Sequence, residues 1–219
     1  MSRSHISVPR LRIALVFSAL FVATTASAQV WNETGDAGDE VATAQSTVGT
    51  GTLTQITGTL SSPNDVDIYC MQLGPAVEVV NYPMLALQCV VNLGPNIWVF
   101  DANGVGVAMN ETCQFGVKQL TNNLIPTSGP LTTYIAVSYY GVQPFTAAGS
   151  IWQTGIPGER APDGTDPSGA LVGWLGAGNV QPSNPYTINV GGPGVITGYC
   201  ESPVTTESAT WGAVKVWFQ

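Results

Sequence analysis

The chain has 219 residues and a formal net charge of −8, with 44% hydrophobic and 9% charged residues. An acidic balance of this kind repels phosphate backbones, which argues against nucleic-acid binding. The only histidine is His5. Once an N-terminal signal is removed, no Ser-His-Asp or Cys-His arrangement and no histidine-bound catalytic zinc is possible.

Residues 1–28 have the pattern of an export signal. A positive segment precedes an apolar run and a small-x-small cleavage pattern: Arg3, Arg10 and Arg12, then 13–23, then Ala26-Ser27-Ala28. A membrane anchor is the alternative, but the run is too short to span a hydrocarbon core of roughly 30 Å as a helix. We therefore expect a signal peptide over 1–28, no membrane span, and a protein that is secreted, periplasmic or held at the cell surface.

Removal of that signal makes the chain more acidic. Three cations remain, Lys118, Arg160 and Lys215. Together with all 14 acidic residues they give a net charge of −11. This charge is compatible with calcium, which prefers carboxylate and carbonyl oxygens, and it also keeps an exported protein soluble. About 190 residues remain, which is enough for one hydrophobic core.

Short β-rich runs, each ended by Gly, Pro, Asn or Asp, follow one another along the chain. The strongest are Leu53–Leu60, 66–73, 85–93, 97–100, 132–140 and 186–190, with weaker candidates at 76–82 and 104–109. Turn signals at a spacing of roughly 8–12 residues are typical of a sandwich or barrel. The pattern predicts an all-β fold, a jelly-roll-like antiparallel β-sandwich over 45–191, preceded by an N-terminal linker over 29–44.

Two carboxylates mark the start of the second run. Asp65 and Asp67 stand two residues apart, and residues two apart on a strand point to the same face. Tyr69, Met71 and Leu73 continue that face as an apolar row. Carboxylates this close repel each other unless a cation or solvent screens them. Each aspartate alone also suits a turn, where it bonds local backbone amides.

The segment Asp101-Ala-Asn-Gly104 follows the run at 97–100. Asn-Gly between apolar runs predicts a hairpin, since both residues tolerate positive φ. The catalytic alternative for such acids is a glycosidase, which works with a carboxylate pair and needs no histidine. The pairs that suit this chemistry are Asp65 with Asp67 and Glu111 with Asp101.

A Gly- and Pro-rich stretch over 153–185 predicts a long excursion between two strands, and loops of this length are often functional. Trp152 borders the stretch and Trp174 lies within it. Exposed aromatic rings offer stacking surfaces for sugars and polymers. We expect these two tryptophans to bind ligand, with burial as hydrophobic plugs as the alternative.

Four cysteines in an exported chain are expected to form disulfides. Cys70 and Cys89 lie on successive predicted strands, which favours a disulfide between them and leaves Cys113 to pair with Cys200. Two other pairings are possible. A four-cysteine zinc site is disfavoured, because the spacing contains no C-x₂-C pair.

Residues 192–219 are expected to form a C-terminal appendage. Glu207 and Lys215 suit the first and last turns of a helix, and Trp211, Val214 and Phe218 fall on one helical face. A short helix and a final strand fit this segment equally well.

A series of short motifs occurs in order between Asn32 and Val190. They are Gly35-Asp-Ala-Gly-Asp39, Ala42-Thr-Ala-Gln45, Ile56-Thr-Gly-Thr-Leu60, Asn64-Asp-Val-Asp67-Ile-Tyr69, Phe100-Asp-Ala-Asn-Gly104, Tyr134-Ile-Ala-Val137-Ser, Leu171-Val-Gly-Trp174 and Tyr186-Thr-Ile. Together they resemble the bacterial pre-peptidase C-terminal domain, in its stand-alone exported variant. The resemblance implies a jelly-roll-like sandwich that is accessory to secreted enzymes and is not itself catalytic. The cysteines, the long excursion and the tryptophan-bearing tail depart from the family pattern.

Some members of that family bind calcium where an N-terminal linker meets the sandwich. Carried over to this chain, the linker ligands would be Asp36 and Asp39, and the ligands at the start of the strand would be Asn64, Asp65 and Asp67. We thus expect a secreted, non-catalytic binding or structural module, stabilised by calcium, that recognises an extracellular polymer or protein surface. The alternative is a small carbohydrate-active hydrolase.

Overall fold

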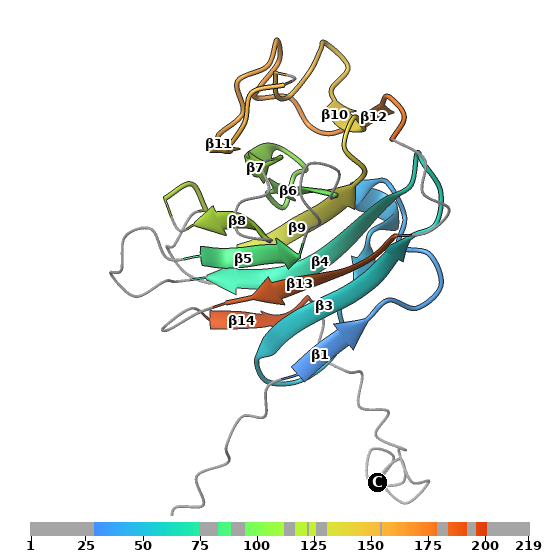
Figure 1. The fold of residues 1–219 in the computed structure, drawn as a ribbon. Helices are drawn as coiled ribbons and strands as arrows, with labels where there is room; N and C mark the ends of the chain where they lie inside the picture. The colour runs from blue at the N-terminus through green and yellow to red at the C-terminus, as the bar shows by residue number, and fades with distance from the viewer. Residues whose placement is uncertain are drawn as a thin grey trace, which may run out of the picture.

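The structure is a computed structural model, and it describes residues 29–74, 83–88, 95–111, 117–121, 123–125, 131–153, 155–178, 184–191 and 196–200. These residues form two β-sheets packed on each other, with a smaller cap at one end (Figure 1). The predicted all-β sandwich is therefore confirmed. No helix in the described part of the chain has the length and apolar character needed to cross a membrane.

The first sheet has five strands in the order β1-β3-β13-β5-β8. In that order their bounds are Gln29–Asn32, Leu53–Leu60, Asn184–Val190, Pro83–Gln88 and Val117–Thr121. All neighbours pair antiparallel except β1, which runs parallel to β3. Along the second half of β3, Ile56, Gly58 and Leu60 are buried while Thr57 and Thr59 are more exposed, because only one face meets the core.

The second sheet has the order β11-β7-β6-β9-β4-β14, and β2 also pairs with β4. Their bounds are Glu159–Arg160, Gly106–Asn110, Asn96–Phe100, Leu131–Ser138, Val66–Gly74, Ile196–Tyr199 and, for β2, Gln45–Ser46. Every residue of β6 is buried. Strands that are covered on both faces read as continuous apolar runs, as residues 97–100 do here.

The predicted hairpin joins β6 to β7. The backbone N–H of Asp101 donates to the carbonyl of Val105 at 2.9 Å, and the Asp101 carboxylate accepts from the N–H groups of Asn103 and Val105. Gly104 has φ of +76°, in the left-handed region that favours glycine. The predicted hairpin is therefore present, with Gly104 in the positive-φ conformation that the sequence predicts and with the Asp101 carboxylate as a further support.

The irregular excursion begins directly after β9 rather than at residue 153. We call residues 139–178 the cap segment; Figure 1 shows it in yellow and orange beyond β6 and β7. Within it, β10 (Gln143–Phe145) pairs antiparallel with β12 (Gly173–Leu175). β11, which also belongs to the cap segment, pairs with β7 and so ties the cap segment to the edge of the second sheet.

The expected boundaries of the sandwich are too narrow at both ends. The expected linker over 29–44 contains β1, which extends the first sheet, and a short 3-10 helix, Val41–Thr43. The expected appendage over 192–219 contains β14, which pairs with β4. Both strands have four residues, and a run this short carries little sequence pattern. Residues 201–219, where a helix or strand was expected, lie outside the described residues.

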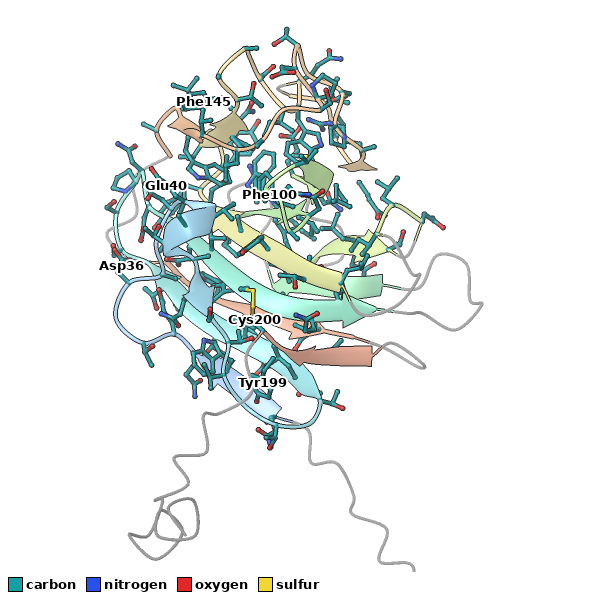
Figure 2. All side chains as sticks on the ribbon, turned by 180° about the vertical axis from the view of Figure 1, so that it is seen from behind. Asp36, Glu40, Phe100, Phe145, Tyr199 and Cys200 are labelled. Atoms are coloured by element: carbon teal, nitrogen blue, oxygen red, sulfur yellow. A yellow bond between two sulfur atoms is a disulfide. The ribbon has the colours of Figure 1, made fainter. Side chains whose placement is uncertain are left out.

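The predicted disulfide between Cys70 and Cys89 is wrong, because Cys70 pairs with Cys200 (Figure 2). In the register of β4 and β14, Met71 lies opposite Tyr199. One residue further, the same antiparallel register sets Cys70 opposite Cys200, with 5.4 Å between their Cα atoms. Cys89 and Cys113 lie outside the described residues, and Cys200 cannot also take the predicted bond to Cys113.

Candidate functional site

Three carboxylates gather where the N-terminal segment meets β4. Asp67 lies near the start of that strand, and Glu33 and Asp36 lie in the loop between β1 and the 3-10 helix. One oxygen from each carboxylate lies within 4.8 Å of the other two. Asp67 is fully buried, Glu33 is half-buried and Asp36 is exposed at the side of the sandwich (Figure 2). The cluster therefore reaches from the core to the surface.

Tyr186 anchors one oxygen of the Asp67 carboxylate. The Tyr186 hydroxyl donates to Oδ2 at 2.6 Å, and it also lies 2.6 Å from the Tyr69 hydroxyl. The other oxygen, Oδ1, has no hydrogen-bond partner among the described residues. A buried oxygen without a hydrogen-bond donor destabilises the fold by about 1–3 kcal/mol, unless a ligand or water molecule binds to it.

The electrostatics of this place disfavour additional negative charge. Burial raises the pKa of Asp67 to about 9, against the lowering effect of the Tyr186 hydrogen bond, and the carboxylates of Glu33 and Asp65 raise it further. Burial also raises the pKa of Tyr186, as does the adjacent Tyr69 hydroxyl. The pKa of Asp36 is raised first by slight desolvation, although the residue is exposed, and then by the charges of Asp65 and Asp39. A cation would relieve this repulsion.

Glu33 is the member of the cluster that sequence reasoning missed. Its Oε1 accepts from the N–H of Ala37 at 3.1 Å, and its Oε2 accepts from the N–H of Thr59 at 2.8 Å. These bonds hold the side chain between the N-terminal loop and β3. The only available signal was its position three residues before Asp36, which lies inside the acidic segment.

The other predicted ligands have different surroundings. Asp65 lies in the turn before β4, where its carboxylate accepts the N–H of Ser61, and Asn64 is exposed in the same turn. The turn interpretation therefore describes these two residues. Asp39 is exposed, and its backbone carbonyl accepts the indole N–H of Trp174 at 2.7 Å. Of the five predicted ligands, the structure brings Asp36 and Asp67 together.

Of the two tryptophans expected to bind ligand, Trp152 is buried and Trp174 keeps only part of its surface exposed. Trp152 is 1% exposed, and its ring lies 5.3 Å from that of Trp98 and 5.8 Å from that of Phe100. Trp174 is half-buried against the same two rings. Both tryptophans fill the space between the cap segment and β6, as large apolar rings tend to do when a loop must be held on a sheet.

An open cavity of about 680 Å³ is formed largely by the cap segment. Its lining comes from the cap segment and from Glu111: Glu111, Tyr140, Gly141, Gln143, Pro144, Phe145, Gly149, Ser150, Gly155, Leu175 and Gly176. Tyr140 and Leu175 are 43% and 61% exposed. Figure 2 shows Phe145 within the cap segment, beyond Phe100 of β6. The volume is within the range of about 300–1,000 Å³ that is typical of ligand sites.

The two carboxylate pairs considered for sugar hydrolysis are not presented together to a substrate. Asp67 is fully buried, so a sugar bond cannot enter between it and Asp65. Glu111 lines the cavity of the cap segment, whereas Asp101 lines another one and binds two backbone N–H groups of its own turn. Glycoside hydrolysis needs both carboxyl groups at one accessible bond.

Comparison with known proteins adds no family to this description. No family model matches the chain, and no curated protein is significantly similar to it.

Proposed function

We propose that the protein is an exported, non-catalytic binding module that recognises an uncharged extracellular polysaccharide through the cavity of the cap segment. The cavity carries this proposal, because it is accessible, of ligand size and walled by apolar groups with a few polar ones. The net charge of −11 after signal removal disfavours anionic polymers. The resemblance to the pre-peptidase C-terminal domain, which is accessory in character, supports the same class of function.

Export is part of the proposal. The charge and cleavage pattern of residues 1–28 support it, and so does the Cys70–Cys200 disulfide, since such bonds persist in oxidising compartments. The cavity suits a sugar ring, because the exposed Tyr140 ring offers a stacking face while Gln143 and Ser150 supply side-chain hydrogen-bonding groups.

A binding screen on insoluble polysaccharides tests this function, with release of reducing sugar measured on the same panel. Tyr140→Ala should weaken binding by about two- to tenfold, since one stacked ring contributes roughly 0.5–1.5 kcal/mol. Val172→Ala is the matched control, because Val172 is exposed on the cap segment and does not line the cavity. Sugar release that Glu111→Gln abolishes would replace the binding module with the hydrolase. Capture of a protein in place of a polysaccharide would contradict the ligand class.

The acidic cluster supports a second part of the proposal, a calcium ion that joins the N-terminal segment to the sandwich. Glu33 and Asp36 from the N-terminal segment and Asp67 from β4 supply three carboxylates, and calcium accepts 6–8 oxygens in a flexible arrangement. The unpartnered, fully buried Oδ1 of Asp67 is the observation that separates this cluster from ordinary surface acids. Backbone carbonyls and water would complete the coordination.

Thermal melts in calcium and in chelator test this ion. At a calcium concentration about 100-fold above the dissociation constant, binding should add about 2.7 kcal/mol to stability. Asp67→Asn and Asp36→Asn should remove the calcium-dependent shift. Asp39→Asn is the control, because the Asp39 carboxylate lies outside the cluster. A shift that Asp39→Asn abolishes and Asp36→Asn preserves would contradict the proposed ligands.

A further inference from the structure

A lysine points into the core from the edge strand β8. Along this strand Lys118 and Leu120 are buried, while Gln119 between them is exposed, which is the alternation of a strand with one face on the core. Lys118 is only 2% exposed. A buried ammonium group costs several kcal/mol even after its surroundings relax, so such a residue needs a structural or chemical reason.

The end of this lysine lies against a buried asparagine of the other sheet. Lys118 Nζ donates to Oδ1 of Asn96 at 2.8 Å, and Asn96 is fully buried as the first residue of β6. The amide nitrogen Nδ2 of Asn96 has no hydrogen-bond partner among the described residues. Since β8 belongs to the first sheet and β6 to the second, this contact spans the sandwich.

Glu111 completes a group of three. In the antiparallel register of β6 and β7, Ile97 lies opposite Asn110, so the next pair outward sets Asn96 opposite Glu111. Directly opposed residues of neighbouring strands share a face. The Glu111 side chain is 5% exposed and forms an ion pair of 3.2 Å with Arg160. A carboxylate thus stands beside the amide that Lys118 contacts.

The low polarity of this place favours the neutral forms of the lysine and the acid. Burial lowers the pKa of Lys118 to about 8, although the charge of Glu111 acts in the opposite direction. Burial raises the pKa of Glu111, against the opposing charges of Arg160 and Lys118. Proton transfer from the ammonium to the carboxylate therefore costs less here than in water.

We propose that Lys118 and Asn96 join in an intramolecular isopeptide bond that links the two sheets, with Glu111 as the proton carrier. Glu111 takes a proton from the Lys118 ammonium, and the neutral Nζ attacks Cγ of Asn96. The Cγ–Nζ bond forms and the Cγ–Nδ2 bond breaks. Nζ passes its second proton to the departing nitrogen, which leaves as ammonia. The ammonia then takes up the proton held by Glu111 and departs as ammonium. No oxidant, metal or other reactant is needed.

The reaction removes two unfavourable groups at once. The buried ammonium becomes an uncharged amide, and the unpartnered NH₂ group of Asn96 leaves the protein. The new bond would join the sheets, whereas the Cys70–Cys200 disulfide joins segments of the second sheet only. The competing explanation is that an inward-pointing charge protects the edge strand β8 from pairing with another chain.

Mass spectrometry of the exported full chain distinguishes the two explanations. We expect the protein to be lighter than its mature sequence, disulfides considered, by the mass of one ammonia molecule. A Gln29 at the N-terminus can also lose ammonia by cyclising, so the loss must be located by peptide mapping. When the chain is cleaved between these two residues, the linked protein should yield a branched peptide that contains Asn96 and Lys118. Trypsin should cut after Arg160 but not after Lys118, whose amine would be blocked.

Variants assign the roles. Lys118→Arg should abolish the branched peptide, and the variant should have the full mass of its mature sequence, without the loss of one ammonia molecule. Glu111→Gln should yield a folded chain in which Lys118 and Asn96 remain unlinked; a linked Glu111→Gln chain would overturn the role of Glu111. Wild-type protein that trypsin cuts after Lys118, with no branched peptide, would overturn the bond itself and leave the edge-protecting charge. The wild-type map decides this even if a variant fails to fold.

Discussion

At the scale of single residues, Asp67 shows what spacing reveals and what it cannot. The sequence placed an acid at the start of a strand, and Asp67 indeed follows Val66, the first residue of β4. Alternation along a strand does not extend to Asp65, because that residue lies in the preceding turn. The place of Glu33 beside Asp67 could not be predicted, since it depends on the pairing of β1 with β3, which no local pattern encodes.

Gly58 permits the pair of tyrosine hydroxyls beside Asp67. A Cβ atom at this position would overlap the hydroxyl oxygens of both Tyr186 and Tyr69. We expect Gly58→Ala to lower the free energy of unfolding by about 1–3 kcal/mol, because a buried strand must shift to make room. Denaturant unfolding measures this loss.

Gly198→Ala is the matched control for that substitution. Gly198 also lies in a strand, and a Cβ there meets only Gln72 at 3.5 Å, an ordinary contact. Relative to glycine, alanine in a strand should be neutral or stabilising by about 0.5–1 kcal/mol. Equal losses in the two variants would show that the hydroxyl pair is not the cause.

The raised pKa of Asp67 predicts how stability changes with pH in the presence of chelator. The group titrates near 3.8 when unfolded and near 9 when folded, so between these values the native state holds a proton that the unfolded state has released. Stability should therefore be greatest at the acidic end of this window and fall as pH rises through it. The groups that face or act on Asp67 are Tyr69, Tyr186, Glu33, Asp36 and Asp65.

Asp67→Asn isolates this contribution, because an amide has nearly the same shape and does not titrate. Its free energy of unfolding, measured across the same pH range, should depend less on pH than that of the wild type. If both proteins show the same slope, another group carries the pH dependence. Calcium should reduce the wild-type slope, since a bound cation favours the ionised carboxylate.

At the scale of elements, strands with long apolar runs were predictable and short pairing strands were not. Leu53–Leu60 was predicted with its observed bounds, and the run at 97–100 is β6 with one residue added at the start. β1 and β14 have four residues each and gain their stability from distant partners. The disulfide was mispredicted for the same reason, because neighbouring strands in sequence were taken as neighbours in space.

The Cys70–Cys200 bond closes a loop with a sequence separation of 130 residues. Constraining a loop of this size in the unfolded chain stabilises the native state, and loss of such a bond typically costs about 2–5 kcal/mol. We expect Cys200→Ser to lower the denaturation midpoint accordingly. Non-reducing peptide mapping supplies the control: a peptide that joins Cys200 to any cysteine other than Cys70 would contradict the register of β4 and β14.

At the scale of the whole molecule, the cap segment and the sandwich share one hydrophobic core. Trp98 and Phe100 of β6 contact Trp152 and Trp174 of the cap segment, and the Trp174 indole also binds the N-terminal loop at Asp39. A Gly- and Pro-rich sequence indicated a loop but not that its tryptophans face inward. The cavity lies elsewhere on the cap segment, because neither tryptophan lines it.

This packing predicts that removing a buried aromatic ring lowers stability, whereas removing an exposed ring of the cavity lowers ligand binding. Trp152→Ala should destabilise the protein by about 3–5 kcal/mol, the usual cost of removing a large buried ring. Tyr140→Ala, which removes an exposed ring, should change stability by no more than about 0.5 kcal/mol while it weakens polysaccharide binding. Denaturant unfolding and binding are measured on both variants. A Trp152→Ala chain with wild-type stability and lost binding would restore the tryptophan surface and displace the cavity of the cap segment as the site.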